Sequence, residues 1–129
     1  MSLAPVPLGL RTVIYPAADL ERAKAWYAAA FGVSPYFDEP FYVGFSIGGF
    51  ELGLDPNAPS NGGATGGAVA YWGVANLDAS VAHFVSREAT IRSPVQDVGD
   101  GIRVATLADP FGNAIGLIEN PHFNTGDVR

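Results

Sequence analysis

The sequence predicts an α+β fold made of two βαβββ modules in tandem, forming a curved mixed sheet cup with the helices outside. The main observation is that the order strand, helix, strand, strand, strand occurs twice along the 129 residues. In addition, the two expected helices start alike, with Asp19 and Asn76 as N-cap residues and Tyr27 and Phe84 at the same offset behind them. An internal repeat of this size is a strong architectural signal.

Length and composition indicate a single domain. A chain of 129 residues with 48% hydrophobic content can bury one core and is too short for two ordinary domains. Its lack of cysteine excludes disulfides, thiolate chemistry and Cys-based zinc sites. The formal charge of −6, with only 7 basic residues, argues against nucleic-acid binding. No segment has the pattern of a signal peptide or a membrane span, so we expect a cytoplasmic protein that binds neither nucleic acid nor membrane.

The first repeat, about residues 8–56, starts with a short strand at 10–15. Gly32 stands where a C-cap glycine belongs and ends the helix that Asp19 begins. The apolar residues of this helix recur at helical spacing and form one stripe, made of Leu20, Ala23, Tyr27, Ala30 and Phe31. Three strands are expected next, at 36–37, 41–47 and 50–54, and Gly48-Gly49 would form a two-residue turn between the last two.

Residues 57–66 are rich in Gly, Asn and Pro and are predicted to be a linker. The second repeat, about 67–120, starts with a strand at 68–74. Its helix has an apolar stripe made of Leu77, Val81, Phe84 and Val85. A strand that begins at Ile91 is expected to stop at Pro94, because proline cannot donate to a sheet ladder.

The last two strands, at 102–108 and 114–119, are expected to form a hairpin. In its turn, Asp109–Asn113, Pro110 presets φ and Gly112 accepts a positive φ. The helices would then pack on one face of the two sheets, on Val13, Tyr15, Phe50, Leu52, Leu54, Trp72, Val74, Ile115 and Leu117.

The opposite strand faces would enclose a pocket. Strand alternation assigns to them Thr12 and Ile14, Glu51 and Gly53, Val69 and Tyr71, Val104 and Thr106, and Ala114 and Gly116. Such an apolar cup with a few polar groups suits a small organic ligand. The predicted ligand-binding residues are Thr12, Ile14, Glu51, Val69, Tyr71, Thr106 and Gly116. Gly53 and Gly116 either leave room for a ligand ring or mark a close backbone approach.

Glu51 is the candidate catalytic residue. In an apolar cup its pKa is expected to rise, which would make it a general acid or base near neutral pH. The same carboxylate could instead pair with a cationic nitrogen of a ligand, or lie partly solvated at the rim.

Three features carry a family resemblance. They are the paired βαβββ halves, the Trp26-Tyr27 and Phe31-Gly32 pairs of the first helix, and the hairpin Asp109-Pro110-Phe111-Gly112-Asn113-Ala114-Ile115-Gly116-Leu117-Ile118. They resemble the vicinal oxygen chelate superfamily, which contains glyoxalase I, bleomycin-resistance proteins, fosfomycin-resistance enzymes and extradiol dioxygenases. The resemblance covers roughly residues 8–120 and speaks for the fold more than for a reaction, since this fold hosts many chemistries. It also implies a homodimer, in some members with exchanged halves.

The resemblance implies four positions for metal ligands. Three of them hold Thr12, Val69 and Gly116, and the fourth holds Glu51 or Gly53, depending on the alignment of the two halves. A catalytic divalent metal needs about three protein ligands, which this set does not supply. His83 and His122 lie elsewhere and are expected to have a structural or surface role. We therefore predict no metal site and no cofactor.

The first functional hypothesis is a metal-free, bleomycin-resistance-like protein that binds a small aromatic or amphipathic molecule in the cup. The alternative is an enzyme (a lyase, an isomerase or a dioxygenase-like protein), either metal-independent with Glu51 as acid or base, or metal-dependent with unidentified ligands. A third hypothesis is a degenerate member that acts as an interaction partner and leaves the cup empty. Whether the protein is an enzyme stays open at this point.

Overall fold

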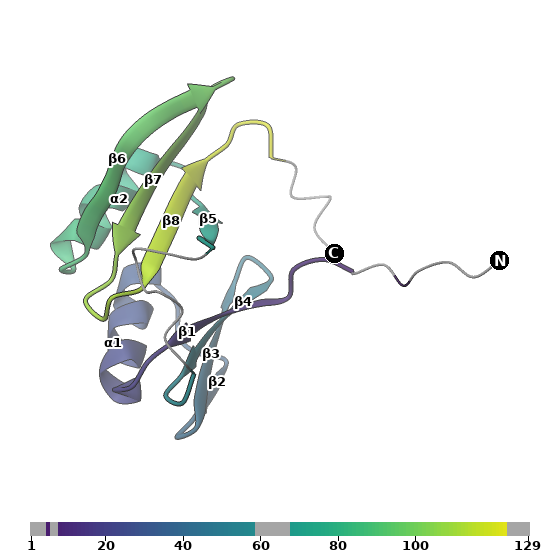
Figure 1. Ribbon diagram of the computed structural model, residues 1–129, viewed down its shortest axis with the longest axis vertical. Helices are drawn as coiled ribbons and strands as arrows, with labels where there is room; N and C mark the ends of the chain where they lie inside the picture. Colours follow the sequence, from purple (N-terminus) through teal and green to yellow (C-terminus); the bar gives the residue numbers. More distant parts are fainter. Residues whose placement is uncertain (1–4, 6–7, 59–67, 124–129) are drawn as a thin grey trace.

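The computed structural model describes residue 5 and residues 8–58 and 68–123. The first module contains β1 (Thr12–Pro16), α1 (Leu20–Phe31), β2 (Phe37–Glu39), β3 (Tyr42–Ile47) and β4 (Phe50–Asp55). The second contains β5 (Tyr71–Gly73), α2 (Leu77–Ser86), β6 (Thr90–Gly99), β7 (Ile102–Ala108) and β8 (Ala114–Glu119). Figure 1 shows the two modules one above the other, with both helices on the same side of the strands. The predicted α+β fold with two tandem βαβββ modules is confirmed, and residues 59–66 of the predicted linker lie outside the described part.

Each module forms a four-stranded mixed sheet with the same topology, in the orders β1-β4-β3-β2 and β5-β8-β7-β6. The first strand of each module pairs in parallel with the last, and the other pairs are antiparallel. The Gly48-Gly49 turn between β3 and β4 forms as predicted, with φ of 57° and 93° and with Ile47 opposite Phe50.

The helix ends follow the sequence prediction. The Asp19 side chain accepts a hydrogen bond from the Arg22 amide at 3.2 Å, and that of Asn76 accepts one from Ala79 at 3.0 Å. Gly32 ends α1 in the left-handed conformation, with φ of 70°. In the described part of the chain, neither helix has the length and apolar character that crossing a membrane requires.

Both helices pack on one face of the sheets and share a single core. The residues buried there include Tyr15, Tyr27, Val43, Phe45, Leu52, Leu54, Trp72, Leu77, Leu107, Ile115 and Leu117. Val13, Phe50 and Val74 are partly buried and pack against this cluster, so the predicted helix-facing set is confirmed. By the usual area relation, each fully buried side chain of this size contributes about 1.5–3 kcal/mol.

Hydrogen bonds from aromatic side chains join the modules. The Trp26 indole donates to the Arg87 carbonyl at 2.6 Å, and the Trp72 indole donates to the Tyr15 hydroxyl at 3.2 Å. His83 on α2 lies 3.2 and 3.1 Å from the carbonyl oxygens of Ala29 and Ala30 at the end of α1. Aromatic residues from both modules therefore connect the modules as well as filling the core.

The turn between β7 and β8 provides another connection. The buried Asp109 carboxylate accepts bonds from the amides of Phe111 and Asn113 at 2.9 and 2.8 Å and from the Asn113 side chain at 2.9 Å. It also accepts a bond from the Tyr27 hydroxyl of α1. The Asn113 side chain donates to the Pro16 carbonyl at 3.2 Å, so the predicted turn anchors the second module to both β1 and α1.

Two sequence predictions in the second module are wrong. Val85 is 42% exposed instead of belonging to the buried stripe of α2, because Leu77, Val81 and Phe84 alone face the core. Pro94 does not end its strand, since β6 continues to Gly99. This strand is at the sheet edge, where a missing N–H is tolerated, and the pairing with β7 shifts between Ser93 and Gln96.

Candidate functional site

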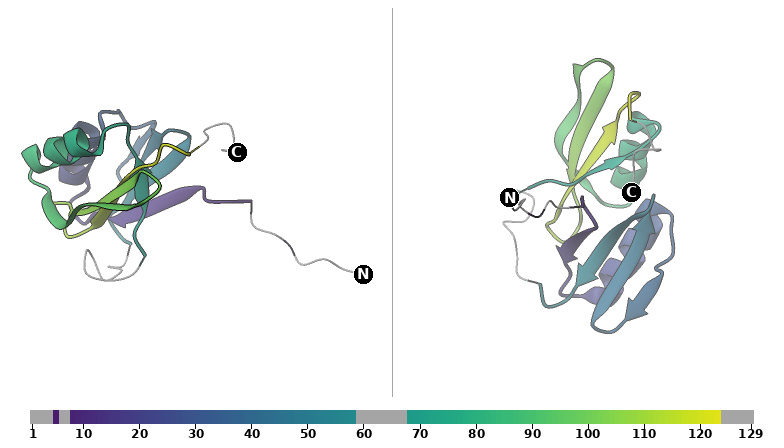
Figure 2. Two further views of the ribbon diagram at one scale, coloured as in Figure 1. Left: turned by 90° about the horizontal axis from the view of Figure 1, so that it is seen from above. Right: turned by 90° about the vertical axis from the view of Figure 1, so that its right-hand side faces the viewer.

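Each sheet has an open face, which we define as the strand face turned away from the helices (Figure 2). The predicted cup residues that belong to strands lie on these faces, because their neighbours in sequence point into the core. Val69 precedes β5 and lies outside the sheet. On the first sheet, Thr12 is opposite Glu51 and Ile14 is opposite Gly53. On the second sheet, Tyr71 and Thr106 are the two strand partners of Gly116.

A hollow of about 370 Å³ lies where the modules meet, between β1 and the segment that leads into β5. Its lining includes Thr12, Ile14, Val69 and Ala114 from the predicted set, together with Leu10 and Ala70. Glu51 borders this group through its hydrogen bond to Thr12.

The structure thus brings Thr12, Ile14 and Val69 together. Tyr71, Thr106 and Gly116 form a separate group on the open face of the second sheet.

Glu51 is surrounded by hydroxyl donors. Its Oε1 accepts bonds from Thr12 at 2.5 Å and from Tyr42 at 2.7 Å, and its Oε2 accepts a bond from the Tyr36 hydroxyl. We call these four residues the Glu51 cluster. β4 supplies the carboxylate, β1 and β3 supply Thr12 and Tyr42, and the segment before β2 supplies Tyr36.

The expectation that the pKa of Glu51 rises is wrong. Burial does raise the pKa of this carboxyl group, but the hydrogen bonds from Thr12, Tyr36 and Tyr42 stabilise the ionised form and together lower the pKa below its ordinary value. Glu51 is therefore an anion at neutral pH. In this form it is suited to attract a positive charge and unsuited to donate a proton.

The pKa values of Tyr36 and Tyr42 shift in the opposite direction, upward. Burial and the hydrogen bond to Glu51 raise the pKa of Tyr42 to about 12. The hydrogen bond to Glu51, with a smaller effect of burial, raises the pKa of Tyr36. Both phenols therefore keep their protons and remain donors to the carboxylate across the physiological range.

Glycines provide the space for these rings. A Cβ atom at Gly53 would lie 1.9 Å from the Tyr42 hydroxyl oxygen, and one at Gly44 would lie 3.1 Å from the Tyr36 ring. On the second sheet, a Cβ atom at Gly116 would lie 2.6 Å from the Tyr71 ring and 2.8 Å from a backbone carbonyl. Close backbone approach therefore holds at Gly116, whereas the space at Gly53 and Gly116 is taken by tyrosine rings of the protein itself and not left open for a ligand ring.

The strand register shows which residue of the first module, Glu51 or Gly53, is the counterpart of Gly116. Ile14 is opposite Gly53 in the first module, and Tyr71 is opposite Gly116 in the second. Since Ile14 and Tyr71 hold the same place before their helices, Gly53 is the counterpart of Gly116. Glu51 then matches Ala114, one step earlier on the same strand face.

Sequence reasoning missed Tyr36 and Tyr42 as site residues, although a signal for Tyr42 was present. The Gly48-Gly49 turn fixes Ser46 opposite Glu51 and Gly44 opposite Gly53, and alternation then places Tyr42 on the same face. Tyr36 precedes β2, and no strand periodicity applies to it.

The histidines lie outside the site, as expected. His83 contacts the carbonyl groups at the end of α1, and His122 contacts the Asp100 carbonyl at 2.7 Å. Over residues 8–58 and 68–123, no group of three or more His, Cys, Asp or Glu side chains is arranged to hold a metal ion.

Two tandem βαβββ modules, with helices on one side and an open strand face on the other, define the class of this protein as the glyoxalase fold. The chain belongs to the Glyoxalase/Bleomycin resistance protein/Dioxygenase superfamily, whose sequence model matches residues 9–117. This confirms the family resemblance described above. No curated protein matches the sequence.

Solved structures agree with this fold. A glyoxalase-related enzyme from Fulvimarina pelagi superposes with a TM-score of 0.71 at 18% identity, over 89% of this chain and 90% of that one. Lactoylglutathione lyase from Agrobacterium tumefaciens gives a TM-score of 0.70 at 22% identity, over 91% and 98%. TioX from Micromonospora sp. ML1 gives 0.68 at 19% identity, over 90% and 99%. At these identities the similarity shows the fold alone.

Proposed function

We propose that this protein is a metal-free binding protein that holds a small aromatic or amphipathic organic molecule on the open faces of its sheets. The observation that carries the proposal is the Glu51 cluster beside the hollow at the module junction. A few oriented polar groups next to an apolar surface are typical of sites for small organic ligands. The candidate contacts are Thr12, Ile14, Glu51, Val69, Tyr71, Thr106 and Gly116, together with Tyr36 and Tyr42.

The donor set does not fit a catalytic metal. The family positions hold Thr12, Val69 and Gly116, and the strand register favours Gly53 for the fourth. Glu51, the nearest carboxylate, already accepts hydrogen bonds at both oxygens. A divalent metal would find a single carboxylate whose acceptor positions are mostly taken, and it would still lack the further protein ligands that it needs.

The competing proposal is an enzyme that uses Glu51 as an acid or base. The lowered pKa of Glu51 speaks against this role, because efficient proton transfer needs a pKa near the working pH.

The proposal is tested by screening aromatic and amphipathic compounds against chelator-treated protein, using thermal shift followed by calorimetry. We expect saturable binding, with the compound recovered chemically unchanged. Ile14→Trp, which fills the hollow, should weaken binding, whereas Ile91→Trp on the edge strand should not. Ile14 and Ile91 are matched controls because they are 47% and 49% exposed.

Turnover of a bound compound would favour the enzyme. A screen without any binder would favour a pure interaction partner and would overturn the proposal.

We further propose that the protein forms a homodimer in which a second copy covers part of the open faces. Ile14 and Tyr71 are each 47% exposed there, and Phe41 is 62% exposed. An interface of about 800 Å² per subunit would be of ordinary size. Light scattering coupled to size-exclusion chromatography should give twice the chain mass of 13.5 kDa. The cytoplasmic location that the cysteine-free sequence favours stays a prediction.

A further inference from the structure

Glu51 has no cationic partner in the described part of the chain. The side-chain ion pairs there join Lys24 to Glu21 and Asp38, and Arg103 to Asp78 and Glu119. Arg11, which directly precedes β1, instead turns its guanidinium toward the carbonyls of Leu8 and Leu10, at 3.5 and 3.3 Å. The charge of Glu51 is thus held in place by neutral hydroxyls alone.

The cluster also leaves capacity for one more donor. A carboxylate offers roughly four lone-pair positions, and hydroxyl groups take two on Oε1 and one on Oε2. The remaining position belongs to Oε2, the oxygen that the exposed Tyr36 reaches. Because Glu51 is only partly buried, a small donor from solvent can approach it.

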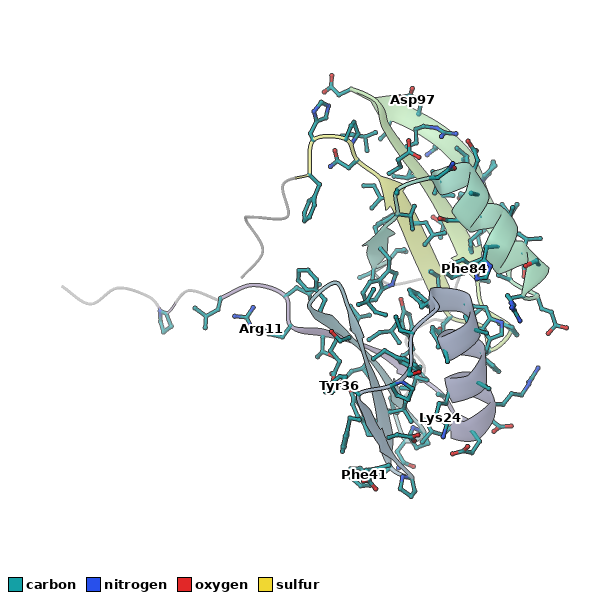
Figure 3. The ribbon with its side chains drawn as sticks, turned by 180° about the vertical axis from the view of Figure 1, so that it is seen from behind. Arg11, Lys24, Tyr36, Phe41, Phe84 and Asp97 are labelled. Atoms are coloured by element: carbon teal, nitrogen blue, oxygen red, sulfur yellow. The ribbon has the colours of Figure 1, made fainter. Side chains whose placement is uncertain are left out.

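Two aromatic side chains adjoin this position, because Tyr36 and Tyr42 both bind Glu51 through their hydroxyls. Tyr36 is 63% exposed and lies beside the first sheet, whereas Phe41, 62% exposed, lies at the tip of that module (Figure 3). The ring centroid of Phe37 lies 5.9 Å from that of Phe41 and 6.2 Å from that of Tyr42, so further aromatic rings pack next to Tyr42. The faces of such rings attract cations, and nearby anionic charge adds to the attraction.

We propose that Glu51 and the rings of Tyr36 and Tyr42 form a subsite for an organic ammonium group. The ammonium group donates to Oε2 of Glu51 and lies against the aromatic rings. The apolar body of the same molecule extends past Thr12 into the hollow between β1 and the start of β5. This inference rests on the proposed function and adds the charge of the ligand to it.

The chemistry of the cluster favours an organic cation over an inorganic one. A metal ion would meet a single carboxylate whose neighbours are protonated hydroxyls, whereas an ammonium group needs only one acceptor and gains from the rings. The net charge of −6 also favours the approach of a cation over that of an anion.

The test uses two probes of nearly equal size, benzylammonium and benzyl alcohol, titrated into the ¹⁵N-labelled full chain and followed by NMR. We expect benzylammonium to bind about tenfold more tightly than benzyl alcohol, with saturable shifts at the amides of Gly44, Glu51 and Gly53. Glu51→Gln keeps the size of the side chain and should remove this preference. Tyr36→Leu, at an exposed position, should weaken benzylammonium binding several-fold.

Glu88→Gln is the matched control, because it removes the same charge from an exposed position at the end of α2. It should leave both titrations unchanged. Equal affinity for the two probes, or benzylammonium binding that survives Glu51→Gln, would overturn the ammonium subsite while leaving a neutral ligand in the hollow possible.

Absence of saturable shifts with benzylammonium would overturn the subsite as well. The compound screen described above separates the two cases, since the proposed function fails only if neutral and cationic compounds alike do not bind.

Discussion

Glu51 shows how local hydrogen bonding can outweigh burial. Its partners are three hydroxyl groups that approach from different strands or loops, and each is a donor that favours the ionised carboxylate. The sequence indicates the apolar surroundings and places Thr12 in the cup, but it does not reveal the bonds that Thr12, Tyr36 and Tyr42 donate to Glu51. The predicted sign of the pKa shift was wrong for this reason.

The effect of Glu51 on its tyrosine partners can be measured through the pKa values of Tyr36 and Tyr42. Spectrophotometric titration should show Tyr42 ionising near pH 12, against an ordinary value of 10.0. A raised pKa in the folded state stabilises the protein fully below the unfolded value, and this contribution is lost as the pH rises through the folded value. Stability should therefore fall between about pH 10 and 12. In Glu51→Gln, Tyr36 and Tyr42 should ionise at lower pH, and an unchanged titration would contradict the cluster.

Gly53 allows a second prediction at the scale of one residue. Gly53→Ala places a Cβ atom 1.9 Å from the Tyr42 hydroxyl oxygen, so we expect a loss of about 1–3 kcal/mol in the free energy of unfolding. The control is Gly73→Ala, where no atom lies within 4 Å of the added Cβ, and its stability should stay within about 0.5 kcal/mol of wild type. Urea unfolding measures both variants, and equal effects would argue against a packed Tyr42 ring.

Among the elements, the β7–β8 turn joins the modules through one buried carboxylate. Asp109→Ala would leave the Tyr27 hydroxyl and two backbone amides without their acceptor, at a cost of about 2–4 kcal/mol. Asp97→Ala removes an exposed carboxylate with a single bond to Gly99 and should cost under about 1 kcal/mol. Chemical denaturation compares the two, and a small effect at Asp109 would show that the turn is not an anchor.

Helix ends and turns could be predicted from the sequence where they depend on residues that are neighbours in the chain. N-caps at Asp19 and Asn76 and the turn at Gly48-Gly49 involve neighbouring residues, and they were predicted correctly. Pro94 was not, because its effect depends on β6 being an edge strand, and edge position is a property of the whole sheet. The faces of the strands were predictable from alternation, but the bonds across them at Glu51 were not.

At the scale of the whole molecule, both tryptophans lie where the modules meet. Trp26 bonds to Arg87 and Trp72 bonds to Tyr15, and the core residues of both modules form one cluster. We therefore predict that the modules unfold together. Tryptophan fluorescence and far-ultraviolet circular dichroism should give coincident denaturation curves. A fluorescence transition that precedes the loss of secondary structure would show that the junction opens first.

The central claim is that the protein works without a metal, and elemental mass spectrometry of the protein purified without added metal tests it most directly. The claim rests on our inference from the family resemblance that the ligand positions hold Thr12, Val69 and Gly116, and the pairing of Ile14 with Gly53 favours a glycine at the fourth. We predict zinc, nickel, iron and manganese contents well below one atom per chain. About one atom of any of these metals per chain would contradict the claim and would redirect the work to metal-dependent enzyme activity.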